Sequence, residues 1–215
     1  MVPRHILHSM TLADKVTSIR LILAPVFFVV YLLPQFFPLA FSIMPSIGSA
    51  GPSLWAPWTV PTLWVLFVLS EITDFLDGMI ARKRGEVSDF GKFFDPFADT
   101  LTQITYFFCF VMDGILPPFL FLAVLYREFS ILFIRNLMLK KGVAMGARMA
   151  GKIKTVTYVL AGALALMASS VVRLGGDAGL YRGFAISAVA AFIVSVLIAF
   201  ISFFDYVSVY RNTKK

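Results

Sequence analysis

The sequence predicts an all-α, polytopic integral membrane protein, and two observations predict this class. Of the 215 residues, 59% are hydrophobic and only 14% are charged, a balance that is not typical of a soluble globular protein. No charged residue occurs from Leu21 to Ser70, although one helical crossing of a bilayer takes only about 20 residues. We therefore expect residues 1–215 to form a single membrane domain that begins with a short amphipathic segment at about 1–12.

Six apolar stretches are each long enough to cross a bilayer. The uncharged run holds more than one crossing, and its prolines and glycines predict a loop at about 34–57, which we expect to lie in the interface or on the bundle. A later helix ends at Asp113-Gly114, and the next one follows Pro117-Pro118. The expected spans are about 12–33, 58–82, 92–112, the stretch after Pro118 to 139, 152–172 and 183–208. Six transmembrane helices place both termini on one side.

The placement of lysine and arginine predicts the orientation. The formal net charge is +7, but no basic stripe interleaved with aromatic residues lies outside the apolar segments, so we expect no nucleic-acid partner. Both termini and the loops after the second and fourth spans carry most of the cations, whereas the opposite loops have only Arg173 and Arg182. Because cationic loops stay cytoplasmic, we expect a multi-pass protein of the cell membrane. The single cysteine excludes an internal disulfide.

Between residues 74 and 99 the chain carries polar residues that are costly near lipid and usually functional. Asp74 and Asp77 are three residues apart, and Asp95 and Asp99 are four apart. Each pair therefore lies on one face of its helix, the first at the end of one span and the second at the start of the next. Pro96 indicates either that the second helix starts near Asp95 or that it is kinked there.

These four carboxylates predict a metal site that opens to the cytoplasm. Gathered together they repel one another unless they are protonated or neutralised by cations. Oxygen-only ligands favour hard ions, so we expect Mg²⁺ or Mn²⁺, and two ions would balance four negative charges. Zinc is disfavoured because Cys109 is alone in an apolar run. Two such ions indicate an in-line displacement at phosphorus, with Arg82 paired to a phosphate and Gly78 leaving room beside the acids.

The spacing of these residues resembles the signature of the CDP-alcohol phosphotransferase family, Asp-x2-Asp-Gly-x2-Ala-Arg-x8-Gly-x3-Asp-x3-Asp. The matching positions are Asp74, Asp77, Gly78, Ala81, Arg82, Gly91, Asp95 and Asp99. The resemblance implies transfer of a phosphate-linked group from a CDP-activated donor to an alcohol, with release of CMP. It also implies that the four aspartates ligate the metals and that Asp99 is the general base for the acceptor hydroxyl.

The same resemblance implies a set of nucleotide contacts. Members of the family typically carry Pro-Asn-x-x-Thr before the first span, and this chain matches that motif in part, with Ala13-Asp14 and then Thr17. Ser88 falls where the family places a small hydroxyl residue near the nucleotide. The residues expected to bind the CDP-lipid are Thr17, Asp14, Gly78, Arg82, Ser88 and Gly91.

A second group of charges predicts where an anionic acceptor binds. Arg127 and Glu128 are adjacent, so their side chains diverge by about 100° around a helix, and we expect that they do not simply neutralise each other. Glu128 and Arg135 share a face. Charges near mid-bilayer are costly, so a polar cavity inside the bundle is expected, with a structural interhelix ion pair as the alternative. The expected acceptor-phosphate residues are Arg127, Arg135, Arg148, Lys152 and Lys154, although the last three could instead form a positive-inside anchor.

The Arg127-Glu128 pair, the later Arg135 and Gly151-Lys152-Ile153-Lys154-Thr155 resemble one branch of the family, the bacterial phosphatidylglycerophosphate synthases. This resemblance implies CDP-diacylglycerol and glycerol 3-phosphate as substrates and membrane lipid as the surroundings, and the family resemblance implies a homodimer. Three alternatives stay open: a family member that uses inositol phosphate or serine, a UbiA-type prenyltransferase, and a transporter with midplane carboxylates.

Overall fold

A computed structural model describes residues 12–36, 58–84, 89–140 and 149–212, which contain six helices and no strand. The helices are α2 (Leu12–Phe36), α4 (Thr59–Arg84), α5 (Asp89–Met112), α6 (Pro118–Lys140), α7 (Met149–Arg173) and α8 (Ala178–Asn212). Each covers one of the stretches that hydropathy predicted, and most of their ends lie within a few residues of the expected ones. The all-α class is therefore confirmed for the described part of the chain.

Three of these helices are long and apolar enough to cross a membrane, judged by length and composition. The apolar stretches are Lys15–Leu32 in α2, Ile153–Arg173 in α7 and Ala178–Arg211 in α8. Large apolar side chains also cover the outside of the bundle, and Phe119 on α6 and Ile186 on α8 are about 70% exposed (71% and 70%). Such an apolar outer surface is that of a membrane protein.

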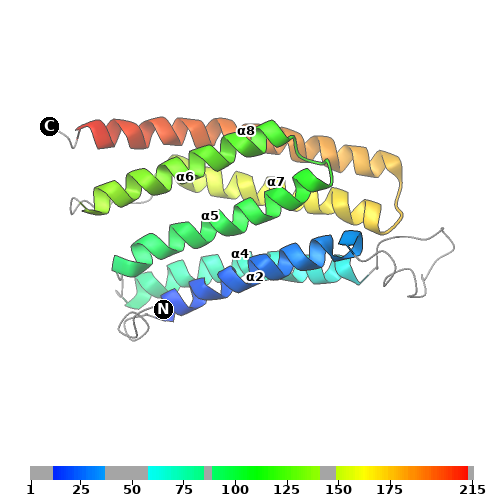
Figure 1. The fold of residues 1–215 in the computed structure, drawn as a ribbon, viewed down its shortest axis with the longest axis horizontal. Coiled ribbons are helices and arrows are strands. Elements are labelled where there is room, and N and C mark those ends of the chain that lie inside the picture. Colours follow the sequence, from blue (N-terminus) through cyan, green and yellow to red (C-terminus); the bar gives the residue numbers. More distant parts are fainter. Residues whose placement is uncertain (1–11, 37–57, 85–88, 141–148, 213–215) are drawn as a thin grey trace.

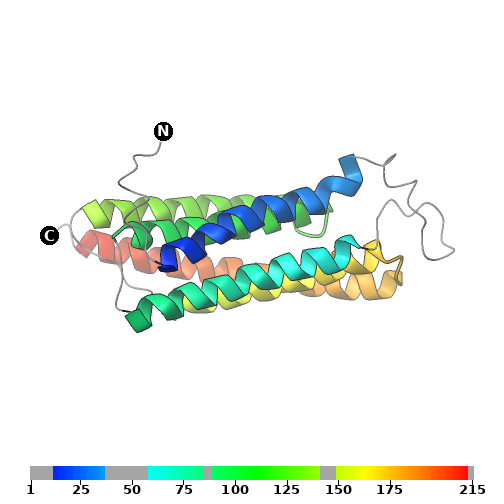
Figure 2. The ribbon, with the colours of Figure 1, turned by 90° about the horizontal axis from the view of Figure 1, so that it is seen from below.

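The helices run side by side, and successive helices point in opposite directions (Figures 1 and 2). α2 packs against α4 and α5 on one side of the bundle, while α8 packs against α7 and α6 on the other. α5 joins the two groups, because it contacts α2, α6 and α7. The amino ends of α2, α5 and α7 and the carboxyl ends of α4, α6 and α8 consequently gather at one end, which we call the site end.

Aromatic side chains on α5 hold the two groups of helices together. Tyr106 packs on Phe27 of α2 with ring centroids 4.4 Å apart. On the other side, Phe107 contacts Phe192 of α8 at 4.7 Å and Tyr158 of α7 at 5.2 Å. All five rings are buried, and tilted aromatic pairs of this kind are each worth about 0.5–1.5 kcal/mol beyond the area that they bury. α5 is thus fixed in the middle of the bundle, with its first turns at the site end.

The structure tests two expectations about where α5 starts and ends. α5 starts at Asp89 and Pro96 lies inside it, so the option that this helix begins near Asp95 is wrong: the turn before the proline is already helical. At its other end α5 stops where expected, since Gly114 has a φ of 71°, the left-handed conformation that commonly ends a helix. Of the predicted loop at 34–57, residues 34–36 belong to α2, and the remainder lies outside the described residues, as does nearly all of the amphipathic segment.

Arg173 is not the loop cation that the charge distribution predicted. It is the last residue of α7 and is only 2% exposed. Its Nε donates to Ser169 Oγ at 3.0 Å, its Nη2 donates to the Tyr31 carbonyl at 3.1 Å, and its guanidinium lies 4.3 Å from the centre of the Tyr31 ring. A buried guanidinium needs such partners. Tyr31 in turn donates to Asp113 Oδ2 at 2.6 Å, so these four residues form a polar cluster at the end of the bundle opposite the site end.

Candidate active site

Two of the four predicted metal-ligating aspartates meet at one arginine. Arg20 on α2 donates from Nη1 to Oδ1 of Asp74 on α4 at 2.6 Å, and the same nitrogen pairs with the carboxylate of Asp99 on α5. The Arg20 side chain is 3% exposed, whereas the two acids are 37% and 36% exposed. Ionised partners make these hydrogen bonds strong. The acids of α4 and α5 therefore converge at the site end, as the sequence predicted.

Thr17 brings a third aspartate into the same cluster. Its hydroxyl donates to Oδ1 of Asp95 at 2.9 Å, and its side chain is fully buried. Thr17 and Arg20 are three residues apart, so they lie on one face of α2. That face supplies hydrogen-bond donors to Asp74, Asp95 and Asp99.

The remaining predicted site residues are described only in part. Gly91 is buried on α5, one turn before Asp95. Ser88 and Arg148 lie outside the described residues. The other members of the set lie on described helices, but their surroundings are outside the description: Asp14 on α2, Asp77, Gly78 and Arg82 on α4, and Lys152 on α7. Their roles stay predictions.

The donor atoms of this cluster suit a hard divalent cation. Within the described side chains, no group of three or more His, Cys, Asp or Glu lies close enough together to hold a metal ion. The three described acids are linked through Arg20 and Thr17, and Asp77, the fourth, lies one turn along α4 from Asp74. All four offer carboxylate oxygens, the ligands that magnesium and manganese prefer. The chemistry of these donors thus fits such an ion, and both its binding here and the number of ions stay predictions.

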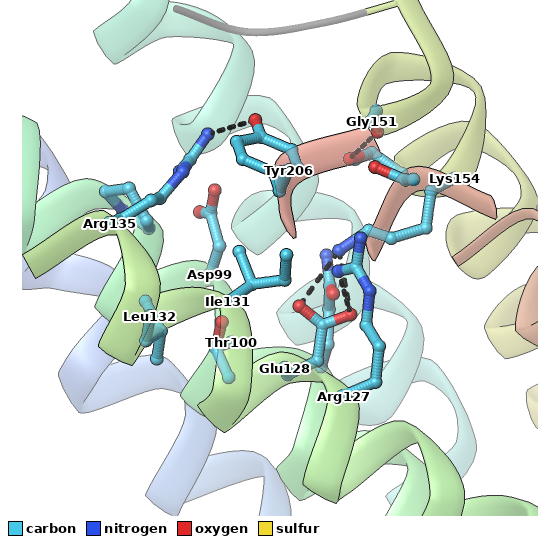
Figure 3. Close-up of a pocket in the computed structure, with 14 residues that line it drawn as sticks. Asp99, Thr100, Arg127, Glu128, Ile131, Leu132, Arg135, Gly151, Lys154 and Tyr206 are labelled. Carbon is cyan, nitrogen blue, oxygen red and sulfur yellow. Dashed lines mark hydrogen bonds and ion pairs between the residues drawn. The ribbon is translucent and has the colours of Figure 1, made fainter. Parts of the chain in front are cut away.

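A polar cavity of about 240 Å³ adjoins the cluster. Asp99 lines it from α5, Arg127, Glu128 and Arg135 line it from α6, and Lys154 lines it from α7. Figure 3 shows these side chains gathered around one space. Asp99 therefore belongs both to the acidic cluster and to the wall of this cavity.

Glu128 is the centre of a buried ionic network in that wall. It accepts hydrogen bonds from Arg127 Nη1 at 2.8 Å, from Lys154 Nζ at 3.0 and 3.1 Å and from the Tyr158 hydroxyl at 3.2 Å. Arg127 Nε donates to the Ala199 carbonyl of α8 at 2.9 Å. The expectation that Arg127 and Glu128 do not neutralise each other is wrong, because the long arginine side chain reaches the neighbouring carboxylate although their Cβ atoms diverge. The sequence left open either a polar cavity or a structural ion pair between helices. Both are present, because Glu128 of α6 pairs with Lys154 of α7 in the wall of the cavity.

Arg135 has a different partner. Its Nη2 donates to the hydroxyl of Tyr206 on α8 at 2.9 Å, and its guanidinium carbon lies 5.4 Å from the centre of the Tyr206 ring, within the range of a cation–π contact. In the described part of the chain, Arg135 forms no ion pair with a carboxylate.

Arg20 and Tyr206 are two residues of the site that sequence reasoning did not select. Arg20 had a usable signal, because it is a cation inside an apolar span one turn after Thr17, and an intramembrane charge is usually functional. Tyr206 had none, since 15% of the chain is aromatic and nothing local distinguishes this tyrosine from its neighbours.

The apolar helices with carboxylates gathered at one end define a membrane protein with a polar site, and comparison with known proteins gives its family. A family model described as CDP-alcohol phosphatidyltransferase matches residues 10–201. The chain belongs to this family and is a transferase. This membership decides against the prenyltransferase and transporter alternatives.

Two curated bacterial proteins illustrate the similarity. A protein of Treponema pallidum named CDP-diacylglycerol–glycerol-3-phosphate 3-phosphatidyltransferase is 36% identical over 208 residues, which cover 94% of this chain and 89% of the relative. A protein of Bacillus subtilis with the same name is 30% identical over 153 residues, covering 70% of this chain and 73% of the relative. The similarity to the Treponema protein thus extends over nearly the whole chain, including the acidic cluster.

Proposed function

We propose that this protein transfers the phosphatidyl group of CDP-diacylglycerol to sn-glycerol 3-phosphate, giving phosphatidylglycerophosphate and CMP. The observation that carries the proposal is the position of Asp99, which pairs with Arg20 beside Asp74 and also lines the cavity that contains Arg135 and Lys154. A carboxylate at this junction can reach a donor held at the acids and an acceptor held in the cavity. The names of the bacterial relatives, which give the same two substrates, support this assignment.

The donor diphosphate lies at the acidic cluster in this proposal. Asp74, Asp77, Asp95 and Asp99 would hold Mg²⁺ or Mn²⁺ there, and two ions would balance the four carboxylates. When bound, the ions supply positive charge that stabilises the diphosphate and the leaving CMP. Arg20 and Thr17 keep three of the carboxylates oriented through the contacts described above, and Arg82 pairs with a phosphate. The cytidine end contacts Asp14, Thr17, Gly78, Ser88 and Gly91, as the family resemblance implies.

Asp99 is the general base of the transfer. One of its carboxylate oxygens takes the proton of the acceptor hydroxyl, while that hydroxyl oxygen forms a bond to the phosphorus next to diacylglycerol. The bond from this phosphorus to the CMP oxygen breaks, and CMP leaves with the electron pair. Arg20, which pairs with Asp99, holds this carboxylate at the junction of the two substrate sites.

The cavity selects an acceptor that carries a phosphate. Arg127, Arg135 and Lys154 line it, and Arg148 and Lys152 extend the same cationic surface in our proposal. Guanidinium groups match phosphate oxygens in charge and geometry. This chemistry favours glycerol 3-phosphate or inositol phosphate over serine, and the relatives' names favour glycerol 3-phosphate.

The placement in the membrane follows the charges. We propose that all six helices cross the bilayer and that the site end faces the cytoplasm, because the helix ends gathered there are the ones next to the cation-rich stretches of the sequence. The water-soluble acceptor then enters from the cytoplasm, and the CDP-lipid enters from the inner leaflet. A homodimer, implied by the family resemblance, completes the proposal and is checked by the mass of the purified protein in detergent.

Turnover with a panel of acceptors tests the assignment. Purified protein with CDP-diacylglycerol and Mg²⁺ should release CMP with sn-glycerol 3-phosphate and not with inositol phosphate or serine. Chelation should abolish turnover, and Mg²⁺ or Mn²⁺ should restore it. Turnover with another alcohol in the absence of turnover with glycerol 3-phosphate would reject the acceptor.

Substitution of the base tests the mechanism. Asp99→Asn should lower turnover at least about a hundredfold, because general-base catalysis is typically worth that much or more, while binding of the CDP-lipid is largely retained. Asp177→Asn is the matched control, since Asp177 lies at the opposite end of the bundle and accepts hydrogen bonds from Gly179 and Leu180, a capping role that asparagine also fills. Equal turnover in the two variants would show that Asp99 is not the general base.

A further inference from the structure

The three described cations of the cavity are not equivalent. Arg127 and Lys154 both donate to the carboxylate of Glu128, which balances one of their two positive charges. Arg135 donates to a neutral hydroxyl and has no carboxylate partner within the described residues. Of the three, Arg135 is therefore the cation whose charge is most fully available to an anion in the cavity.

The guanidinium of Arg135 has one nitrogen that is already hydrogen-bonded and one that is available to a phosphate oxygen. Nη2 is occupied by the Tyr206 hydroxyl at 2.9 Å. Nε is buried and has no hydrogen-bond partner in the described part of the chain. A buried donor without a partner is costly, and a phosphate oxygen of the acceptor would satisfy it.

Tyr206 fixes the guanidinium in this orientation. Its side chain is 3% exposed, and it contacts Arg135 through both its hydroxyl and its ring. Figure 3 shows Tyr206 between the Arg135 side of the cavity and the Lys154 side. An arginine side chain that is already oriented loses less conformational entropy when it binds a ligand.

We propose that Tyr206 of α8 is a positioning residue for the acceptor: it holds the guanidinium of Arg135 so that this group binds the phosphate of the acceptor alcohol next to Asp99. The inference rests on the acceptor site proposed above and adds α8 to the helices that determine the affinity for the acceptor. Its distinctive consequence is that Tyr206 acts on acceptor binding only through Arg135.

Tyr206→Phe tests the role of the hydroxyl. The KM for sn-glycerol 3-phosphate should rise about two- to tenfold, the effect of one hydrogen bond, while kcat and the KM for CDP-diacylglycerol stay within twofold. Tyr206→Leu, which also removes the ring, should raise the acceptor KM further. Tyr181→Phe makes the same chemical change at the other end of α8 and should leave all three constants unchanged. An unchanged acceptor KM in Tyr206→Phe, or an equal loss of kcat instead, would overturn the inference.

A double-mutant cycle with Arg135→Gln separates this inference from the proposed acceptor site. Arg135→Gln should raise the acceptor KM by more than Tyr206→Phe does, and adding Tyr206→Phe to it should have no further effect. If Arg135→Gln leaves the acceptor KM unchanged, the proposed acceptor site is itself wrong. If Arg135→Gln raises the KM and Tyr206→Phe has the same effect with or without Arg135, the acceptor site stands and the positioning role is rejected. Melting temperatures of all variants in detergent check that each one folds.

Discussion

Nη1 of Arg20 lies 2.6 Å from Oδ1 of Asp74, and this contact joins α2 to α4 at the centre of the acidic cluster. The same nitrogen pairs with Asp99 of α5, so one guanidinium connects three helices. The signature segment supplies the carboxylates, but their relative positions depend on a residue of the first helix that lies outside it.

Replacing Arg20 should disorganise the cluster. Arg20→Gln removes the charge between Asp74 and Asp99, and turnover should fall roughly tenfold to a hundredfold, because small displacements of catalytic groups cost that much. Arg20→Lys keeps the charge but has a single nitrogen on a flexible stem, so its turnover should be intermediate. CMP release from CDP-diacylglycerol measures the effect. Arg182→Gln, an exposed site on α8, is the control, and a fully active Arg20→Gln enzyme would show that the contact is dispensable.

Thr17 makes a separable contribution to the same cluster. Thr17→Val keeps the shape of the side chain but removes the hydroxyl that donates to Asp95 at 2.9 Å. The ratio kcat/KM for CDP-diacylglycerol should fall about two- to tenfold, as expected for one hydrogen bond. Thr17→Ser retains the donor and should stay close to the wild type. If the valine and serine variants behaved alike, the methyl group rather than the hydrogen bond would matter.

Local patterns in the sequence predicted the helices and the grouping of the acids, because hydropathy and three- or four-residue spacing are properties of short segments. The contact between Arg127 and Glu128 was mispredicted because it depends on how a long side chain bends, which spacing does not encode. Arg173 was assigned to a loop by its position in the chain, whereas its burial depends on Tyr31 and Ser169 of other turns and helices. Tyr206 lies next to Arg135 because α8 packs on α6, and no local pattern in the sequence indicates this packing.

Glu128 should stabilise the folded protein as well as line the cavity. Glu128→Gln leaves the buried cations Arg127 and Lys154 without their shared carboxylate, and breaking a buried ionic network in this way costs about 3–5 kcal/mol. The midpoint of unfolding in detergent should therefore fall markedly. Adding Lys154→Met to Glu128→Gln removes one of the two uncompensated cations and should recover part of the loss. A Glu128→Gln variant as stable as the wild type would mean that water or lipid already solvates these cations.

The cluster at the opposite end of the bundle should affect stability without affecting substrate binding. Arg173→Met removes the guanidinium that contacts Ser169 and Tyr31 and that lies 3.9 Å from Asp113, so the unfolding midpoint should drop. Because Arg173 and the acidic cluster lie at opposite ends of α7 and its neighbours (Figure 1), the KM values for both substrates at low temperature should stay within about twofold. Arg182→Met removes an exposed arginine nearby in the chain and should change neither quantity. A raised KM in Arg173→Met at unchanged stability would instead mean that the two ends of the bundle are coupled through the tilt of α5 and α7.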